Sequence, residues 1–171
     1  NDEVFVSGPG YLRQLLDTNA DGVADKFEPA NFQPRQGAQG LLVERDQLWV
    51  VADRAIWRVP RAAGQSAAKW LELPKTGGEH DFHSLRRGSD GWLYFLAGNQ
   101  AQIDRDFVTS PLPIPEPQAG VVGRISPDGQ VRQVLVHGMR NAYDFALDLD
   151  GSFLVYDSDD ERDAGLPWYR P

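Results

Sequence analysis

Apolar and polar residues alternate with a period of two along most of the chain, in runs of about six residues. Three runs resemble one another, at residues 47–53, 91–97 and 151–157. Alternation of this kind is typical of β-strands with one buried face. The last two runs follow Asp90-Gly91 and Asp150-Gly151, and Asp-Gly between apolar runs predicts a hairpin, because glycine accepts a positive φ. Helical periodicity is not evident in any window of helical length, so the pattern predicts an all-β protein.

A second recurring piece places an arginine inside an apolar run. Arg13 and Arg58 are 45 positions apart, whereas Arg58 and Arg124 are 66 positions apart. The extra 21 positions fit an insertion at residues 100–119. Proline stands at alternate positions of this insertion, at Pro111, Pro113, Pro115 and Pro117. Alternate prolines exclude a central strand, so we expect a loop that is partly extended as polyproline.

The strand pattern predicts a β-propeller. A third piece closes the repeat at residues 68–73 and 130–136, and both segments alternate with period two. Short antiparallel strands that repeat about every 45 residues are typical of propeller blades. We therefore expect residues 1–171 to form part of a propeller domain, with roughly two full blades and a partial blade at each end. The remaining blades or another chain would cover the open sheet edges. The alternative is a self-contained β-sandwich with an irregular repeat.

Composition favours a folded domain and excludes some functions. Of the 171 residues, 41% are hydrophobic and five are tryptophan, enough for a core. The net charge of −8 argues against a basic surface for nucleic acid. A membrane-spanning apolar run is lacking. The N-terminal residues have neither a basic nor an apolar signal region, so a secreted protein would have lost its signal or would lack it here. The absence of cysteine leaves the redox compartment open.

An acidic segment, residues 17–28, matches the calcium-binding loop of twelve residues. Oxygen-bearing side chains occupy its first, third, fifth, ninth and last positions, and Gly22 stands where the loop turns sharply. The backbone carbonyl of Val23 would complete the ligand set. The predicted ligands are Asp17, Asn19, Asp21, Val23, Asp25 and Glu28. The flanks lack helical pattern, so we expect the loop to join two strands and its calcium ion to be structural.

Two histidines form a polar cluster at residues 77–83. His80 and His83 are three positions apart, and acidic residues flank His80 on both sides. Three interpretations remain open: a transition-metal site, a pair of loop histidines with backbone partners, or a general base. In the last, Glu79 or Asp81 would orient the imidazole of His80.

A second polar cluster, at residues 138–144, precedes the strand-like run at 145–149. It places the guanidinium of Arg140 beside the carboxamide of Asn141. Such a pair is common in turns, where it bonds loop carbonyls. The functional interpretation is a pair of donors aimed at an oxyanion or a quinone oxygen.

The two clusters, in this order and each followed by an Asp-Gly hairpin, resemble the soluble quinoprotein sugar dehydrogenases. The similar segments are EHDFHSLRRGSDGWLYFLAGNQ from Glu79 and GMRNAYDFALDLDGSFLVYDSDDERD from Gly138. The related sorbosone-dehydrogenase-like proteins, often fused to cytochrome c modules, resemble the chain more closely, in the acidic loop, the EHxxH stretch and the ending GLPWYRP. The resemblance spans most of the chain outside the proline-rich insertion.

The resemblance implies a six-bladed propeller that binds pyrroloquinoline quinone (PQQ) and calcium and oxidises a sugar. His80 falls at the position of the catalytic base, and Arg140 and Asn141 fall where the quinone oxygens are held. Ser158 and Asp159 fall near the calcium of the cofactor. The cations for the cofactor carboxylates belong to later blades, which this sequence does not contain.

The resulting expectation is a periplasmic or extracellular oxidoreductase of the sugar or aldose dehydrogenase type, with a cytochrome c as a possible electron acceptor. The alternative is a non-catalytic, calcium-stabilised propeller that binds carbohydrate or protein.

Overall fold

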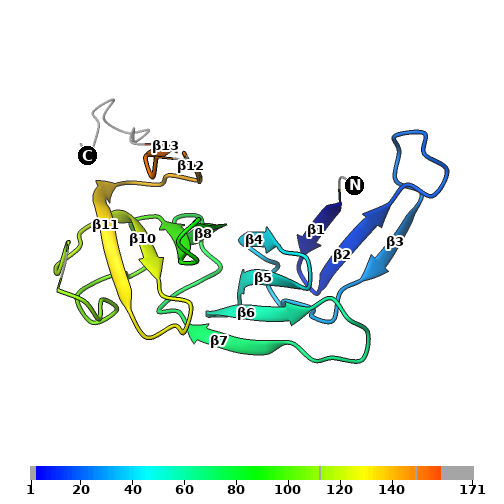
Figure 1. Cartoon of the computed structure of the whole chain (residues 1–171), viewed down its shortest axis with the longest axis horizontal. Helices are drawn as coiled ribbons and strands as arrows, with labels where there is room; N and C mark the ends of the chain where they lie inside the picture. The colour runs from blue at the N-terminus through cyan, green and yellow to red at the C-terminus, as the bar shows by residue number, and fades with distance from the viewer. Residues whose placement is uncertain (1–2, 112, 149, 159–171) are drawn as a thin grey trace. The chain divides into compact units, whose positions relative to one another are not determined.

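The structure is a computed structural model that describes residues 3–111, 113–148 and 150–158. The described chain is all-β, as predicted, and contains thirteen strands. These are β1 (Val4–Gly8), β2 (Tyr11–Leu16), β3 (Lys26–Pro29), β4 (Gly40–Val43), β5 (Gln47–Ala52), β6 (Ala55–Pro60), β7 (Ala68–Glu72), β8 (Phe82–Arg87), β9 (Leu93–Ala97), β10 (Gly120–Ile125), β11 (Arg132–Met139), β12 (Asp144–Leu147) and β13 (Phe153–Tyr156) (Figure 1). The chain divides into two compact units, Asn1–Glu72 and Leu73–Pro171.

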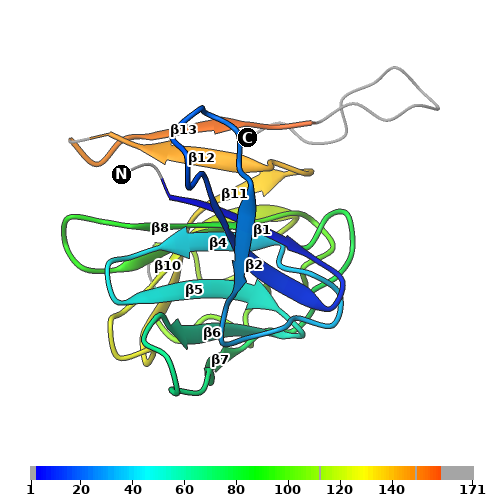
Figure 2. The same ribbon diagram turned by 90° about the vertical axis from the view of Figure 1, so that its right-hand side faces the viewer.

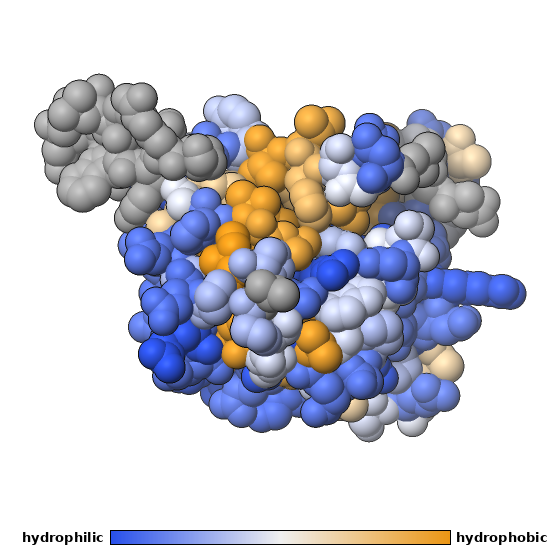
Figure 3. Space-filling view, turned by 60° about the vertical axis from the view of Figure 1, so that its left-hand side comes forward, coloured by the Kyte–Doolittle hydropathy of each residue, from blue (hydrophilic) through white to orange (hydrophobic). Residues whose placement is uncertain are grey.

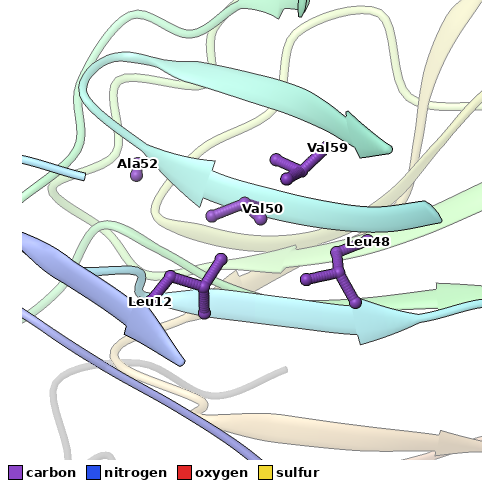
Figure 4. Close-up of a cluster of buried hydrophobic side chains, with 5 residues drawn as sticks. All are labelled: Leu12, Leu48, Val50, Ala52 and Val59. Carbon is purple, nitrogen blue, oxygen red and sulfur yellow. The ribbon is translucent and has the colours of Figure 1, made fainter. Parts of the chain in front are cut away.

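The first unit contains a three-stranded sheet, β1-β2-β3, and a four-stranded sheet, β4-β5-β6-β7. Consecutive strands pair antiparallel, and Figure 2 shows β4 to β7 lying one below the other in chain order. A common core joins the two sheets, in which Leu12 of β2 meets Leu48 and Val50 of β5 (Figure 4). These side chains are at most 2% exposed, so their alternation along the strands directs one apolar face of each sheet into this core.

The second unit repeats this plan with a four-stranded sheet, β8-β9-β10-β11, and the two-stranded sheet β12-β13. Phe145 of β12 packs with Leu96, Val122 and Met139 of the larger sheet. The outward residues of the two-stranded sheet stay exposed, and Leu154 is 70% exposed. Figure 3 shows apolar side chains gathered at the upper side of the molecule, the side on which β12 and β13 lie in Figure 1.

The recurring arginines identified in the sequence occupy equivalent places in three sheets. Arg13 lies in β2, Arg58 in β6 and Arg124 in β10. Each guanidinium lies over an aromatic ring, 4.1 Å from Phe27 of β3, 4.8 Å from Trp49 of β5 and 4.4 Å from Trp92 directly before β9, respectively. These cation–π contacts give a physical reason for the repeated pattern, because the ring faces attract the partly buried cation.

The repeat is interrupted where the sequence predicts an insertion. In the first unit, only Asp53 and Arg54 connect β5 to β6, and both have positive φ values of 48° and 60°. Residues 98–119 make the corresponding connection from β9 to β10. The described residues of this segment contain no strand, which agrees with the predicted loop at 100–119.

The described strands form four antiparallel sheets, of three, four, four and two strands in chain order. None of the sheets formed by the described residues closes into a barrel. Within the same residues, no helix has the length and apolar character needed to cross a membrane.

Candidate functional site

Three loops of the second unit meet beside the ends of β8 and β9. They are residues 77–81 before β8, residues 98–100 after β9 and residues 140–143 before β12. Backbone hydrogen bonds join them: the Gly98 N–H donates to Asp81 O at 2.8 Å, and the Asn99 N–H donates to Arg140 O at 2.8 Å. The two polar clusters predicted from the sequence therefore form one site, which we call the loop cluster.

Gly98 allows the three loops to approach this closely. A Cβ atom on Gly98 would lie 2.6 Å from the carbonyl oxygen of His80 and 2.9 Å from Oδ1 of Asn141. Both distances are shorter than a carbon–oxygen contact permits. A glycine is required here because of this packing rather than because of a positive φ.

His80 is half-buried in the loop cluster, and its partner is Asn99. The Nδ1 atom of His80 lies 2.8 Å from Oδ1 of Asn99. A carboxamide oxygen only accepts hydrogen bonds, so Nδ1 carries the hydrogen of the neutral imidazole. The lone pair of the ring is then on Nε2, which makes Nε2 the atom that can accept a proton.

This arrangement differs from the expectation that Glu79 or Asp81 would orient His80. Glu79 is exposed at the surface. Asp81 is fully buried, and its Oδ2 accepts the Gly78 N–H at 2.7 Å. Its Oδ1 lies 3.2 Å from Nζ of Lys75, an ion pair without well-directed hydrogen-bond geometry. Asp81 therefore closes the turn before β8 instead of polarising the imidazole.

His83 is positioned by an irregularity in β8. Phe82 pairs with Ala97 and Leu85 pairs with Phe95, so β8 contains one more residue than β9 between these pairs. Such bulges change the direction of side chains and are frequent near functional sites. Here the bulge coincides with a contact between Nε2 of His83 and Oδ1 of Asn141, at 2.8 Å.

His83 is 2% exposed and its ring stacks on that of Tyr143. Burial lowers the pKa of His83, against the opposing effects of the Asn141 hydrogen bond and the Asp81 charge. The imidazole is therefore neutral near pH 7, and its Nε2–H donates to the Asn141 oxygen. This bond fixes the carboxamide and leaves its Nδ2 group as the donor end. The two histidines thus bind different asparagines, His80 through Nδ1 and His83 through Nε2.

Asp157 holds the backbone of the second polar cluster. Its two oxygens accept the N–H groups of Arg140 and Asn141, at 3.0 and 2.8 Å. The Arg140 guanidinium donates from Nη1 to the carbonyl oxygen of Ser158 at 3.1 Å. Arg140, Asn141 and Ser158 therefore lie together, whereas Asp159 lies outside the described residues.

The acidic loop is the hairpin connection between β2 and β3, as expected. Asp17 accepts the Gly22 N–H at 2.7 Å, and Gly22 has a φ of 88°. Asp21 accepts the Val23 N–H at 2.8 Å, and the Asn19 oxygen accepts the Asp21 N–H at 3.1 Å. The loop thus folds around its own carboxylates.

The last two predicted calcium ligands differ in their placement. Asp25 lies in the loop, where hydrogen bonds from Thr18 lower its pKa. Glu28 lies on β3 opposite Gln14, and its carboxylate is 3.0 Å from Nζ of Lys26. Among the described residues, no group of three or more His, Cys, Asp or Glu side chains is arranged so that it could hold a metal ion. The structure therefore brings the loop residues together but leaves Glu28 on the sheet.

Sequence reasoning missed two members of the loop cluster, Asn99 and Asp157. In the sequence, both residues stand out only as members of the two similar segments, which begin at Glu79 and Gly138. The only feature of the sequence that could have identified them is their position at the end of a strand. Asp157 directly follows β13, and Asn99 follows β9 after one glycine. Polar residues at strand ends are frequent in functional sites because loops carry them at a common rim.

No protein-family model matches the sequence, and a search of curated proteins found no match.

Proposed function

We propose that this chain is part of a quinone-dependent sugar dehydrogenase in which His80 removes the proton of a sugar hydroxyl. The observation that carries the proposal is the His80–Asn99 contact of 2.8 Å. It assigns the proton-accepting lone pair to Nε2, within a cluster that also contains Arg140 and Asn141. A base beside two polar donors is suited to oxidation of an alcohol.

The proposed scaffold is a β-propeller. In both four-stranded sheets the strands follow one another in chain order, β4 to β7 and β8 to β11. This order is typical of propeller blades, whereas sandwiches with Greek-key connections place consecutive strands in different sheets. The flanking sheets of three and two strands would be completed by the remaining blades or by another chain.

The residues of the loop cluster fit one end of PQQ. Arg140 supplies a guanidinium and Asn141 supplies an Nδ2 donor, and both groups can bond the two oxygens of a quinone. The carboxylates of the cofactor need further cations. Lys75 is already paired with Asp81, so we assign those cations to the blades outside this sequence.

In the proposed reaction, bound PQQ would supply an acceptor for the hydride of the sugar carbon, and Arg140 and Asn141 would hold its quinone oxygens. The hydroxyl proton moves to Nε2 of His80, and the alcohol becomes a carbonyl. Asn99 keeps Nδ1 protonated throughout, because its oxygen accepts that hydrogen. Ser158 fixes the direction of Arg140, and Ser158 and Asp159 would lie near the calcium of the cofactor.

We also propose that the acidic loop binds a structural calcium ion. Four side chains and one carbonyl would bind it: Asp17, Asn19, Asp21, Asp25 and the carbonyl of Val23. This assignment is supported by the short spacing of the oxygen ligands along the sequence and by the turn at Gly22. Calcium is abundant in the periplasm and outside cells, where we expect the protein to act, with a cytochrome c as electron acceptor.

The test is aldose-dependent dye reduction by the full-length gene product after addition of PQQ and calcium. His80→Ala should lower the activity by about 10²–10⁴-fold, whereas Glu79→Ala should retain it, because Glu79 is exposed in the same loop. A His80→Ala variant as active as the wild type would refute the role of the base. Sugar binding without any dye reduction would instead favour the non-catalytic carbohydrate-binding propeller.

A further inference from the structure

Tyr143 presents an aromatic ring to solvent while its other face is firmly covered. The residue is 62% exposed. Its ring stacks on that of His83, with the two centroids 4.3 Å apart and the planes inclined by 24°. One face of the Tyr143 ring is thus covered by His83 and the other is open to solvent.

The supporting histidine is itself immobilised. His83 is 2% exposed, and its Nε2 bonds Oδ1 of Asn141 at 2.8 Å. The next residue in the sequence, Asp144, begins β12 and forms an ion pair of 2.7 Å with Arg86. The Tyr143 ring is therefore held in place before any ligand arrives, which reduces the ordering cost of binding.

The ring lies next to the proposed quinone donors. Asn141 and Tyr143 are two positions apart, and both contact His83. Tyr143 therefore belongs to the same loop, residues 140–143, as the proposed donor Asn141, and the two side chains share His83 as a partner.

We propose that the exposed face of Tyr143 is the stacking platform for the sugar ring of the substrate. One face of a pyranose consists of C–H groups, which pack on an aromatic ring, while its hydroxyl groups point outward to polar partners. The assignment of a sugar rests on the proposed function. Tyr143 would set affinity and orientation, and His83 would be the positioning residue beneath it.

The test measures the binding of D-glucose, D-galactose and D-xylose to the full-length protein without PQQ, by saturation-transfer NMR. Tyr143→Ala and Tyr143→Leu should bind about two- to tenfold more weakly, since a stacking contact contributes roughly 0.5–1.5 kcal/mol. Tyr143→Phe should bind like the wild type. Tyr156→Ala is the matched control, because Tyr156 is an 81% exposed tyrosine on β13. If the alanine variant does not fold, the leucine variant decides, because it keeps the volume but not the flat ring.

Failure of this inference and failure of the proposed function give different results. Wild-type dye reduction with an unchanged KM in Tyr143→Leu would overturn the platform and leave the dehydrogenase intact. Sugar binding that depends on Tyr143, without dye reduction, would support the platform and refute the dehydrogenase. Binding of none of the three sugars, or binding unaffected by Tyr143→Leu, would overturn the platform.

Discussion

His80 and Asn99 are 19 positions apart in the sequence, yet Nδ1 of the imidazole lies 2.8 Å from Oδ1 of the carboxamide. This contact joins the loop before β8 to the loop after β9. It also determines the chemistry of the imidazole, because a carboxamide oxygen can only accept the Nδ1 hydrogen and so leaves Nε2 as the base.

The first prediction concerns this contact. Asn99→Leu keeps the size of the side chain but removes the acceptor, so the two neutral tautomers of His80 become comparable and the ring loses its orientation. We expect kcat for aldose oxidation to fall by about tenfold or more, within the range that a well-placed base contributes. Gln100→Leu is the control, since Gln100 is exposed in the same loop. Equal losses in both variants would contradict the role of Asn99.

The second prediction concerns the approach of the loops. Gly98→Ala places a Cβ atom 2.6 Å from the His80 oxygen, so the loops must separate. We expect a loss of about 1–3 kcal/mol in the free energy of unfolding, typical of overpacking, measured by urea denaturation. The NMR signals of the His80 ring and of the Asn99 side-chain amide should shift together. An alanine variant with unchanged stability and unchanged signals would show that the loops are not in contact.

The third prediction concerns the pH dependence of stability. Burial lowers the pKa of His83 below its usual value of 6.5, so the unfolded chain binds more protons than the folded protein once the pH falls below that value. Stability should therefore decrease as the pH drops through 6.5, by at most about 1.4 kcal/mol per pH unit, and level off below the folded pKa.

Urea denaturation of wild type and His83→Gln at pH 7, 6 and 5 tests this expectation. The glutamine variant should be less stable at pH 7 but should lose little further stability on acidification. The pKa values of Asp128 and Asp150 are lowered by hydrogen bonds, from Ser126 and Ser152 respectively. Their stabilising effect is lost only as the pH falls below about 4, outside this window. Parallel pH profiles of the two proteins would contradict the assignment to His83.

The fourth prediction concerns calcium. An ion that binds only the folded protein raises its stability, so a chelator should lower the melting temperature of the wild type. Asp21→Ala should remove this response, because Asp21 lies inside the loop and bonds Val23. Glu28→Gln should keep most of it, because Glu28 is paired with Lys26 on β3. If Glu28→Gln also loses the response to the chelator, Glu28 binds the ion as well, as in the complete calcium loop of twelve residues.

The repeat of strands could be predicted from the sequence because it depends on local patterns. The alternation around Trp49 and the arginine at position 58 predict strands, and the structure pairs these two residues directly. The long connection after β9 was equally accessible, because prolines at alternate positions are incompatible with a strand. The position of the acidic loop between two strands also follows from its flanks.

The partners within the site could not be predicted, because they depend on tertiary contacts. Nothing in the spacing from His80 distinguishes Asn99 from other polar loop residues, and the adjacent acids looked more suitable. Glu28 shows the same limit. Its place in the motif assigns it to calcium. In the structure, however, Glu28 lies in β3, where it pairs with Gln14 of β2 and forms an ion pair with Lys26. Antiparallel pairing outweighs a motif position when the residue falls inside the strand.

The most direct test of the account is a single-turnover measurement of quinone reduction by aldose, in the full-length protein loaded with PQQ and calcium. Wild type and His80→Ala should bind PQQ with similar affinity, because Arg140 and Asn141 remain in place. The rate of quinone reduction should fall by about 10²–10⁴-fold in His80→Ala, the range by which a general base contributes to a reaction. Equal rates in the two proteins would contradict the assignment of His80 as the base.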